Sequence, residues 1–264
     1  MTKLMVNILP TVIVMVFSMF GVLHVGASDT ADRSQNEEQI KAKLISRLNS
    51  KDANQRAHAV FEIVDMFQKG IVIKEAIPGL IKELERIDFA HLSEESGEYS
   101  GELIHILGEY KDVRAIPALL NGLGHVGGTS VTEGYAKIGP TLLDALFLKV
   151  NNESHTVRID ALYYIGKLPQ NMIRYGYDIS TDHKRKIKEC LLSSLKDKKF
   201  NIRYSAIKAI DNVQSIYNKD ELADFITLLE SLSKNDPYID KTENNAYSIR
   251  INAALVMNHL KTRQ

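Results

Sequence analysis

The stretch SHTVRIDALYYIGKLP, at residues 154–169, decides the fold because the chain contains two later variants of it. These are FNIRYSAIKAIDNV at residues 200–213 and YSIRINAALVMN at residues 247–258. The arginine of the three copies lies at positions 158, 203 and 250, so the repeat is about 45 residues long. A recurrence at this period is typical of proteins built by stacking one small unit.

Each copy contains a Val/Ile-Arg pair, and an alanine follows three residues after the arginine. The pairs are Val157-Arg158, Ile202-Arg203 and Ile249-Arg250, and the alanines are Ala161, Ala206 and Ala253. Further apolar residues follow at intervals of three and four, which indicates one buried face of a helix. The alanines therefore predict a face that packs closely against a neighbouring helix.

An amphipathic helix is expected before each copy, at residues 141–150, 186–195 and 221–232. A polar turn joins it to the copy, so the unit is helix, turn, helix. The first half of the chain has the same pattern less strictly, beginning with residues 40–64, where Arg56 opens the second helix.

Two further units begin with Ala-Ile-Pro, at residues 76–78 and 115–117. Proline suits the first turn of a helix because its missing N–H has no helical acceptor there. The partner helices are expected at residues 96–110 and 130–139, and position 131, where the alignment places the arginine, is Val.

Together these residues resemble the HEAT repeat, in the subtype called PBS-lyase HEAT-like. The Ala-Ile-Pro and Val/Ile-Arg motifs carry the resemblance, with Ile-Gly at residues 138–139 and 165–166. It covers about residues 37–264 and implies an all-α protein, a right-handed α-solenoid of about six stacked helix pairs. It implies no shared catalytic residue. Since one helix pair cannot bury its apolar face alone, neighbouring copies are expected to stack and bury each other's apolar faces.

The N-terminal residues and the composition limit the possible classes of protein. Residues 1–27 have the features of a secretory signal peptide, with cleavage expected before Ser28, and residues 28–36 are expected to be a short flexible segment. The rival interpretation is an uncleaved membrane anchor. The net charge of 0 does not favour nucleic acid. With Cys190 as the only cysteine, an intramolecular disulfide is impossible, and its neighbours predict a structural position on an apolar helix face.

The repeated arginines are interpreted as structural, pairing with acids or carbonyls between helices. Residues 122–128 formally contain Gly-x-Gly-x-x-Gly, but no strand is expected before them, so they are interpreted as a turn. The eight histidines form no recognisable metal motif, and the sequence has no serine-hydrolase elbow.

Charge placement gives the first candidate binding residues. A basic segment contains Lys184, Arg185, Lys186 and Lys188, and an acidic segment contains Glu94, Glu95 and Glu98. These segments could steer a charged partner, or they could be solvated helix faces.

Two apparent insertions give further candidates. Residues 168–183 hold Arg174, Tyr175 and Tyr177, which are residue types common at binding hot spots, and residues 233–247 lengthen the last turn. The alternative interpretation is a capping loop or a tolerated change of length.

From these features we expect an exported, non-enzymatic interaction module that binds a protein or peptide on the solenoid surface. An inhibitor or a sequestering scaffold is a sharper version. No cofactor and no nucleic-acid partner are expected, and a membrane partner only if the N-terminal segment is retained. The alternatives are an enzyme related to HEAT-like lyases or glycosylases, and a membrane-tethered scaffold.

Overall fold

A computed structural model describes residues 27–238 and 248–262, and within these ranges it contains twelve α-helices, short 3-10 turns and no β-strand. The expected signal peptide falls on residues outside these ranges, apart from its last position. The chain divides into two compact units, residues 1–41 and residues 42–264. Within the described residues, no helix combines the length and hydrophobicity needed to cross a membrane.

The helices form six successive pairs along the chain. The first helices of the pairs are α1 (Ala27–Leu48), α3 (Ile77–Glu85), α5 (Ile116–Leu120), α7 (Thr141–Lys149), α9 (Thr181–Ser194) and α11 (Ala223–Asn235). The second helices are α2 (Ala53–Gln68), α4 (Glu94–Tyr110), α6 (Thr129–Ile138), α8 (His155–Arg174), α10 (Phe200–Val213) and α12 (Ile249–Thr262).

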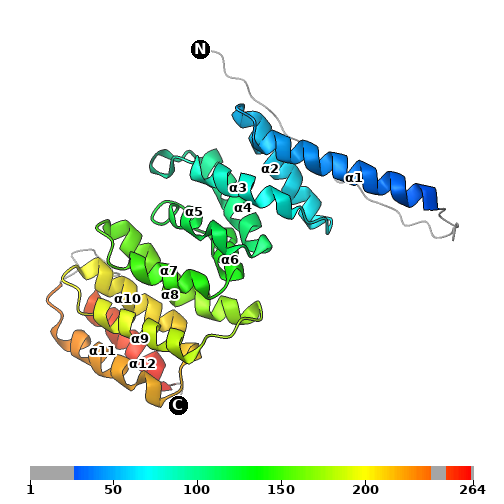
Figure 1. Ribbon diagram of the computed structural model, residues 1–264. Helices are drawn as coiled ribbons and strands as arrows, with labels where there is room; N and C mark the ends of the chain where they lie inside the picture. The colour runs from blue at the N-terminus through cyan, green and yellow to red at the C-terminus, as the bar shows by residue number, and fades with distance from the viewer. Residues whose placement is uncertain (1–26, 239–247, 263–264) are drawn as a thin grey trace, which may run out of the picture. The chain divides into compact units, whose positions relative to one another are not determined.

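In the second unit the pairs stack in chain order, and each layer of the stack takes one helix from every pair. The second helices contact one another in the series α4, α6, α8, α10 and α12, and the first helices follow the parallel series α3, α5, α7, α9 and α11 (Figure 1). This arrangement is an α-solenoid, and it confirms the predicted all-α class and the number of pairs. We call the solvent-facing surfaces of the two layers the second-helix face and the first-helix face.

Small residues set the spacing inside the second-helix layer. Ala161, Ala206 and Ala253 are fully buried, as their position in the repeat predicts. A Cβ added to Gly166 would lie 2.6 Å from Cα of Ala209, so α8 and α10 touch at their backbones. Close packing of this kind leaves no room for a larger side chain.

Local capping explains where several helices begin. The Asp52 and Ser180 side chains accept hydrogen bonds from backbone N–H groups at the starts of α2 and α9, and Ser93 forms a reciprocal capping box with Ser96 at the start of α4. The prolines of the two Ala-Ile-Pro motifs lie in the first turns of α3 and α5, as predicted.

The structure differs from the sequence prediction in residues 168–183. Helix α8 continues through Pro169 to Arg174 and α9 begins at Thr181, so only residues 175–180 connect the two helices. Pro169 has no N–H to donate to a carbonyl one turn earlier, and this lack normally makes proline unfavourable in the interior of a helix. Pro169 and Met172 are both buried in α8, so packing outweighs the lost hydrogen bond.

The structure also differs from the sequence prediction at residues 28–36. A flexible segment was expected there, but α1 begins at Ala27 and includes these residues. This stretch contains neither glycine nor proline to interrupt a helix. The second apparent insertion, residues 233–247, is described only as far as Tyr238; α11 extends into it to Asn235.

Candidate binding surfaces

The repeated arginines hold neighbouring repeats together. The Arg203 guanidinium donates to both carboxylate oxygens of Asp236 in the next repeat, at 2.7 and 2.8 Å. It also donates to the backbone carbonyls of Asp197 and Lys198, in the turn of its own repeat. Arg250 donates to the backbone carbonyl of Asp236 at 2.9 Å. The Arg203 side chain therefore holds the turn of its own repeat in place and joins that turn to the next repeat.

The same pattern occurs at two other repeats. Arg158 donates to the Val150 carbonyl at 2.8 Å and pairs with Asp197 in the following turn. Burial pushes the pKa of Asp197 upward, but hydrogen bonds from Lys199 N–H and Arg158 outweigh it and hold that pKa below its usual range.

Arg56 donates to Glu83 of α3 at 2.6 Å and to two turn carbonyls of its own repeat, those of Ser50 and Lys51. These contacts confirm the structural interpretation of the arginines.

Much of the predicted basic segment is neutralised within the protein. Arg185 pairs with Asp182 and Glu189, Lys186 with Asp182 and Asp144, and Lys188 with Asp224. The hydrogen bonds that Lys186 donates to Asp182 and Asp144 raise its pKa. Lys184 has no carboxylate partner among the described residues, and neither have Lys196, Lys198 and Lys199 further along. The positive charge open to a partner therefore lies mainly at the end of α9.

The predicted acidic residues are solvent-exposed at the start of α4. Glu94 and Glu95 occupy its first turn, where negative charge favours the helix dipole, and Glu98 follows one turn later. Within the part of the chain that the structure describes, no ion pair or hydrogen bond joins them to the basic segment. The two candidate sets are therefore separate surfaces.

Arg174, Tyr175 and Tyr177 lie where α8 leads into α9. The Tyr177 hydroxyl donates to the Lys137 carbonyl at 2.6 Å, and its ring packs against Gly139 at the end of α6. Lys137 Nζ lies 5.1 Å from the centre of the Tyr175 ring. The two tyrosines thus hold the connection between α8 and α9 against α6, while Arg174 is exposed. Burial raises the pKa of Tyr177.

The second-helix face carries large apolar side chains that sequence reasoning missed. Helix α2 adjoins this face, because the centre of the Phe61 ring lies 5.8 Å from that of Tyr99 on α4. Phe61, Tyr163 and Leu255 are 50%, 42% and 52% exposed, and each lies five residues after the arginine of its repeat. Lys208 occupies the same position in the fifth repeat. Core packing does not require an apolar residue at an exposed position. The aligned copies contained this signal, but solvent exposure cannot be read from one sequence.

A groove of about 180 Å³ lies beside Tyr163, between α8 and α10. Its lining is Ile159, Asp160, Tyr163, Tyr204, Ser205, Lys208, Ala209 and Asn212. Small-molecule sites usually measure about 300–1,000 Å³, so this groove suits one side chain of a larger partner. Asp160 accepts a hydrogen bond from Gly124 N–H at 2.6 Å, and burial raises the pKa of its carboxyl group despite that bond.

The structure also shows where the residues considered for enzyme chemistry lie. No group of three His, Cys, Asp or Glu side chains there is placed to hold a metal. Burial raises the pKa of Cys190 to about 11, so its thiol is protonated at neutral pH. Residues 122–128 connect α5 to α6 without a strand, as predicted, and Gly124 and Gly128 have positive φ angles there.

The fold defines the class of protein, which is a HEAT/armadillo-like helical-repeat α-solenoid. Among solved structures, the CpcE–CpcF complex of phycocyanin lyase from Nostoc is similar, with 22% identity, a TM-score of 0.46, and coverage of 69% of this chain and 98% of that one. A designed armadillo repeat protein in complex with the peptide (KR)4 matches at 18% identity and a TM-score of 0.44, covering 83% of this chain and 98% of that one. No family model and no curated protein matches the chain. At these identities and scores, no function is transferred.

Proposed function

We propose that this protein is a non-enzymatic, exported interaction module that binds a protein or peptide along its second-helix face. The observation that carries the proposal is the recurrence of exposed Phe61, Tyr163 and Leu255 at one position of the repeat. Aromatic and aliphatic side chains of this kind act as anchors when a partner removes them from water. A stack of preformed repeats presents them with little ordering cost.

Charge on α4 and α6 favours cationic residues in the part of a partner that lies over these two helices, whereas Lys208 on α10 is itself cationic. Glu98 on α4 and Glu133 on α6 have no ion-pair partner among the described residues. Their negative charge would guide a cationic segment toward the apolar anchors. A sharper version of the proposal is an inhibitor or a sequestering scaffold, in which binding neutralises the partner or holds it away from other proteins.

Peptides selected from a displayed random library against residues 28–264 supply defined ligands for the test. The face variants are Phe61→Asp and Leu255→Asp, and the control is Val113→Asp, which changes a residue of 49% exposure outside the second helices. We expect either face variant to weaken a selected peptide at least about tenfold and the control to leave affinity unchanged. Equal affinity for all four proteins would contradict the proposal.

Export is tested separately, by the mass of the mature N-terminus after expression in a cell with a secretory pathway. A chain that begins at Ser28 supports export with cleavage. An intact Met1 in the membrane fraction would favour the tethered scaffold.

A further inference from the structure

The opposite surface, the first-helix face, contains a larger groove between α7 and α9. It measures about 690 Å³. Its lining is Asp144, Phe147, Leu148, Val150, Asn151, Arg158, Lys186, Glu189, Cys190, Ser193, Ser194 and Asp197. A second hollow of about 550 Å³, at the edge formed by the turns within the helix pairs, shares Arg158, Ser193 and Asp197 with it. The two hollows therefore adjoin at these three residues, and we describe them together as one groove that opens at the turns.

One end of this groove is apolar. Leu148 is 80% exposed, more than any other large apolar side chain among the described residues, and Phe147 and Val150 beside it are half-buried. An amphipathic first helix would normally place a polar residue at so exposed a position. The apolar wall is therefore suited to contact with a partner.

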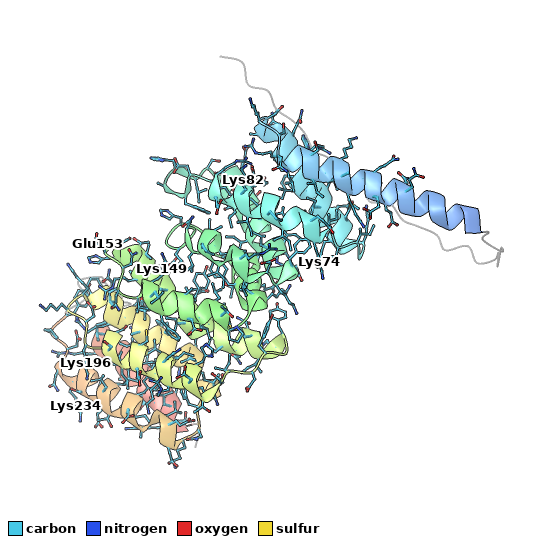
Figure 2. The ribbon with its side chains drawn as sticks, viewed as in Figure 1. Lys74, Lys82, Lys149, Glu153, Lys196 and Lys234 are labelled. Carbon is cyan, nitrogen blue, oxygen red and sulfur yellow. The ribbon has the colours of Figure 1, made fainter. Side chains whose placement is uncertain are left out.

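The other end of the groove is cationic. Lys196, Lys198 and Lys199 line it, and none has a carboxylate partner among the described residues. Figure 2 shows Lys196 with Lys149 on the edge where α7 and α9 end. Helix α10 begins at this point, and its N-cap, Lys199, supplies no side-chain acceptor to the first turn. The positive end of the helix dipole therefore adds to the charge of the lysines.

In the apolar part of the groove, by contrast, the positive charge from α9 is neutralised by a carboxylate. Lys186 lines the apolar part of the groove but its charge is matched by Asp144, and Glu189 also lies on that rim. A uniform polyanion such as a nucleic acid would need positive charge along the whole groove, and these carboxylates would repel it. A segment with apolar residues at one end and carboxylates at the other fits both ends.

We propose that this groove binds a short acidic peptide segment of another protein. Its apolar residues pack against Leu148 and Phe147, and its carboxylates contact Lys196, Lys198 and Lys199. This surface is independent of the second-helix face, so the protein would hold two partners, or two parts of one partner, on opposite layers of the stack.

The test uses a fluorescein-labelled peptide in which leucine and phenylalanine precede a run of glutamates, together with its reversed sequence. Fluorescence anisotropy measures the affinity of residues 28–264 for both peptides at low and high salt. We expect one order to bind more tightly, and added salt to weaken it because the lysines are solvent-exposed. No binding of either peptide at millimolar concentration would overturn the proposal.

Matched variants locate the binding surface. The triple substitution Lys196→Gln, Lys198→Gln and Lys199→Gln should weaken the peptide about tenfold or more. The control triple, Lys74→Gln, Lys82→Gln and Lys219→Gln, changes the net charge equally at exposed lysines outside the groove; two of them are labelled in Figure 2. An equal loss in both triples would show that only net charge matters and would overturn the site.

Three further measurements separate this inference from its rivals. Leu148→Ser should also weaken the peptide, and an unchanged affinity would overturn the apolar half of the site. A DNA duplex that binds with the same dependence on the three lysines would identify a general polyanion patch and overturn the peptide assignment. Leu255→Asp should leave this peptide unaffected, so the proposed function and this inference can fail separately.

Discussion

Arg203 and Arg185 both form ion pairs with carboxylates, but their surroundings give the pairs different roles. In the Arg203–Asp236 pair the side chains are 8% and 1% exposed, and two nearly parallel hydrogen bonds join them. The Arg185 side chain is 56% exposed, and so are its partners in large part. Water therefore screens the second pair but not the first.

We predict that Arg203→Ala destabilises the protein by about 3–5 kcal/mol, because it leaves the Asp236 carboxylate buried without its counter-charge. The matched substitution Arg185→Ala should cost less than about 1 kcal/mol. Urea unfolding followed by circular dichroism measures both values. Similar losses in the two variants would mean that the Arg203 pair does not join the repeats as the geometry indicates.

Asp160 gives a prediction that depends on pH. Its folded-state pKa is raised by burial, so the folded protein binds a proton more tightly than the unfolded chain does. Stability is therefore lost as the pH rises from about 4 through the folded-state pKa. Asp160→Asn keeps an acceptor for Gly124 N–H and removes this loss.

We expect Asp160→Asn to raise the melting temperature at pH 7 by about 1–3 °C, a small gain because the carboxyl group is partly exposed. Near pH 3 the variant and the parent should melt together. A lower melting temperature of the variant at pH 7 would show that the carboxylate is stabilising instead.

At the scale of helices, α4 and α6 pack through two glycines, Gly108 and Gly134. A Cβ added to Gly134 would lie 2.5 Å from the backbone oxygen of Ile104, and one added to Gly108 would collide with the Gly134 backbone. Gly166 and Ala209 make the equivalent contact between α8 and α10.

Helix α4 offers its own control for this packing. Gly108→Ala should force the two helices apart and cost about 1–3 kcal/mol or more. Gly101→Ala in the same helix meets no atom within 4 Å, so it should stabilise the helix by about 0.5–1 kcal/mol. Thermal unfolding of both variants measures these changes, and a neutral Gly108→Ala would contradict the close contact.

Sequence patterns predicted which parts of the chain form helices better than they predicted where each helix ends. The period of the apolar residues and the Ala-Ile-Pro motifs place the helix pairs correctly, because burial of one face and the geometry of proline act locally. The continuation of α8 through Pro169 was not predictable, because it depends on packing against helices distant in the sequence. Tyr175 and Tyr177 were interpreted as binding candidates for the same reason, since their contacts with α6 appear only in the fold.

At the scale of the whole second unit, the extensive contacts of each repeat are with its neighbours in the stack, so damage should remain local. We predict that Ala206→Asp, which places an unpaired charge in a fully buried contact of α10, increases amide exchange in α8, α10 and α12. Exchange in α4 should stay unchanged. Hydrogen exchange with mass detection measures both regions, and a uniform increase would show that the stack unfolds as one unit.

The candidate surfaces could be predicted only in part. The sequence locates the basic segment, but the structure shows that Arg185, Lys186 and Lys188 are paired within the protein. Apart from Lys184, the unpaired lysines of this region lie just after the end of α9. Ion pairs between α9 and its neighbours bring together residues from different repeats. The exposed apolar positions, in contrast, recur at one place in the repeat and could be found once the register is known.

The central claim is that a partner binds along the second helices, and a crystal structure of the protein with a library-selected peptide tests it most directly. The account predicts a peptide that crosses α8, α10 and α12 and covers Tyr163 and Leu255. A peptide seated elsewhere, with those two side chains still exposed to solvent, would contradict it.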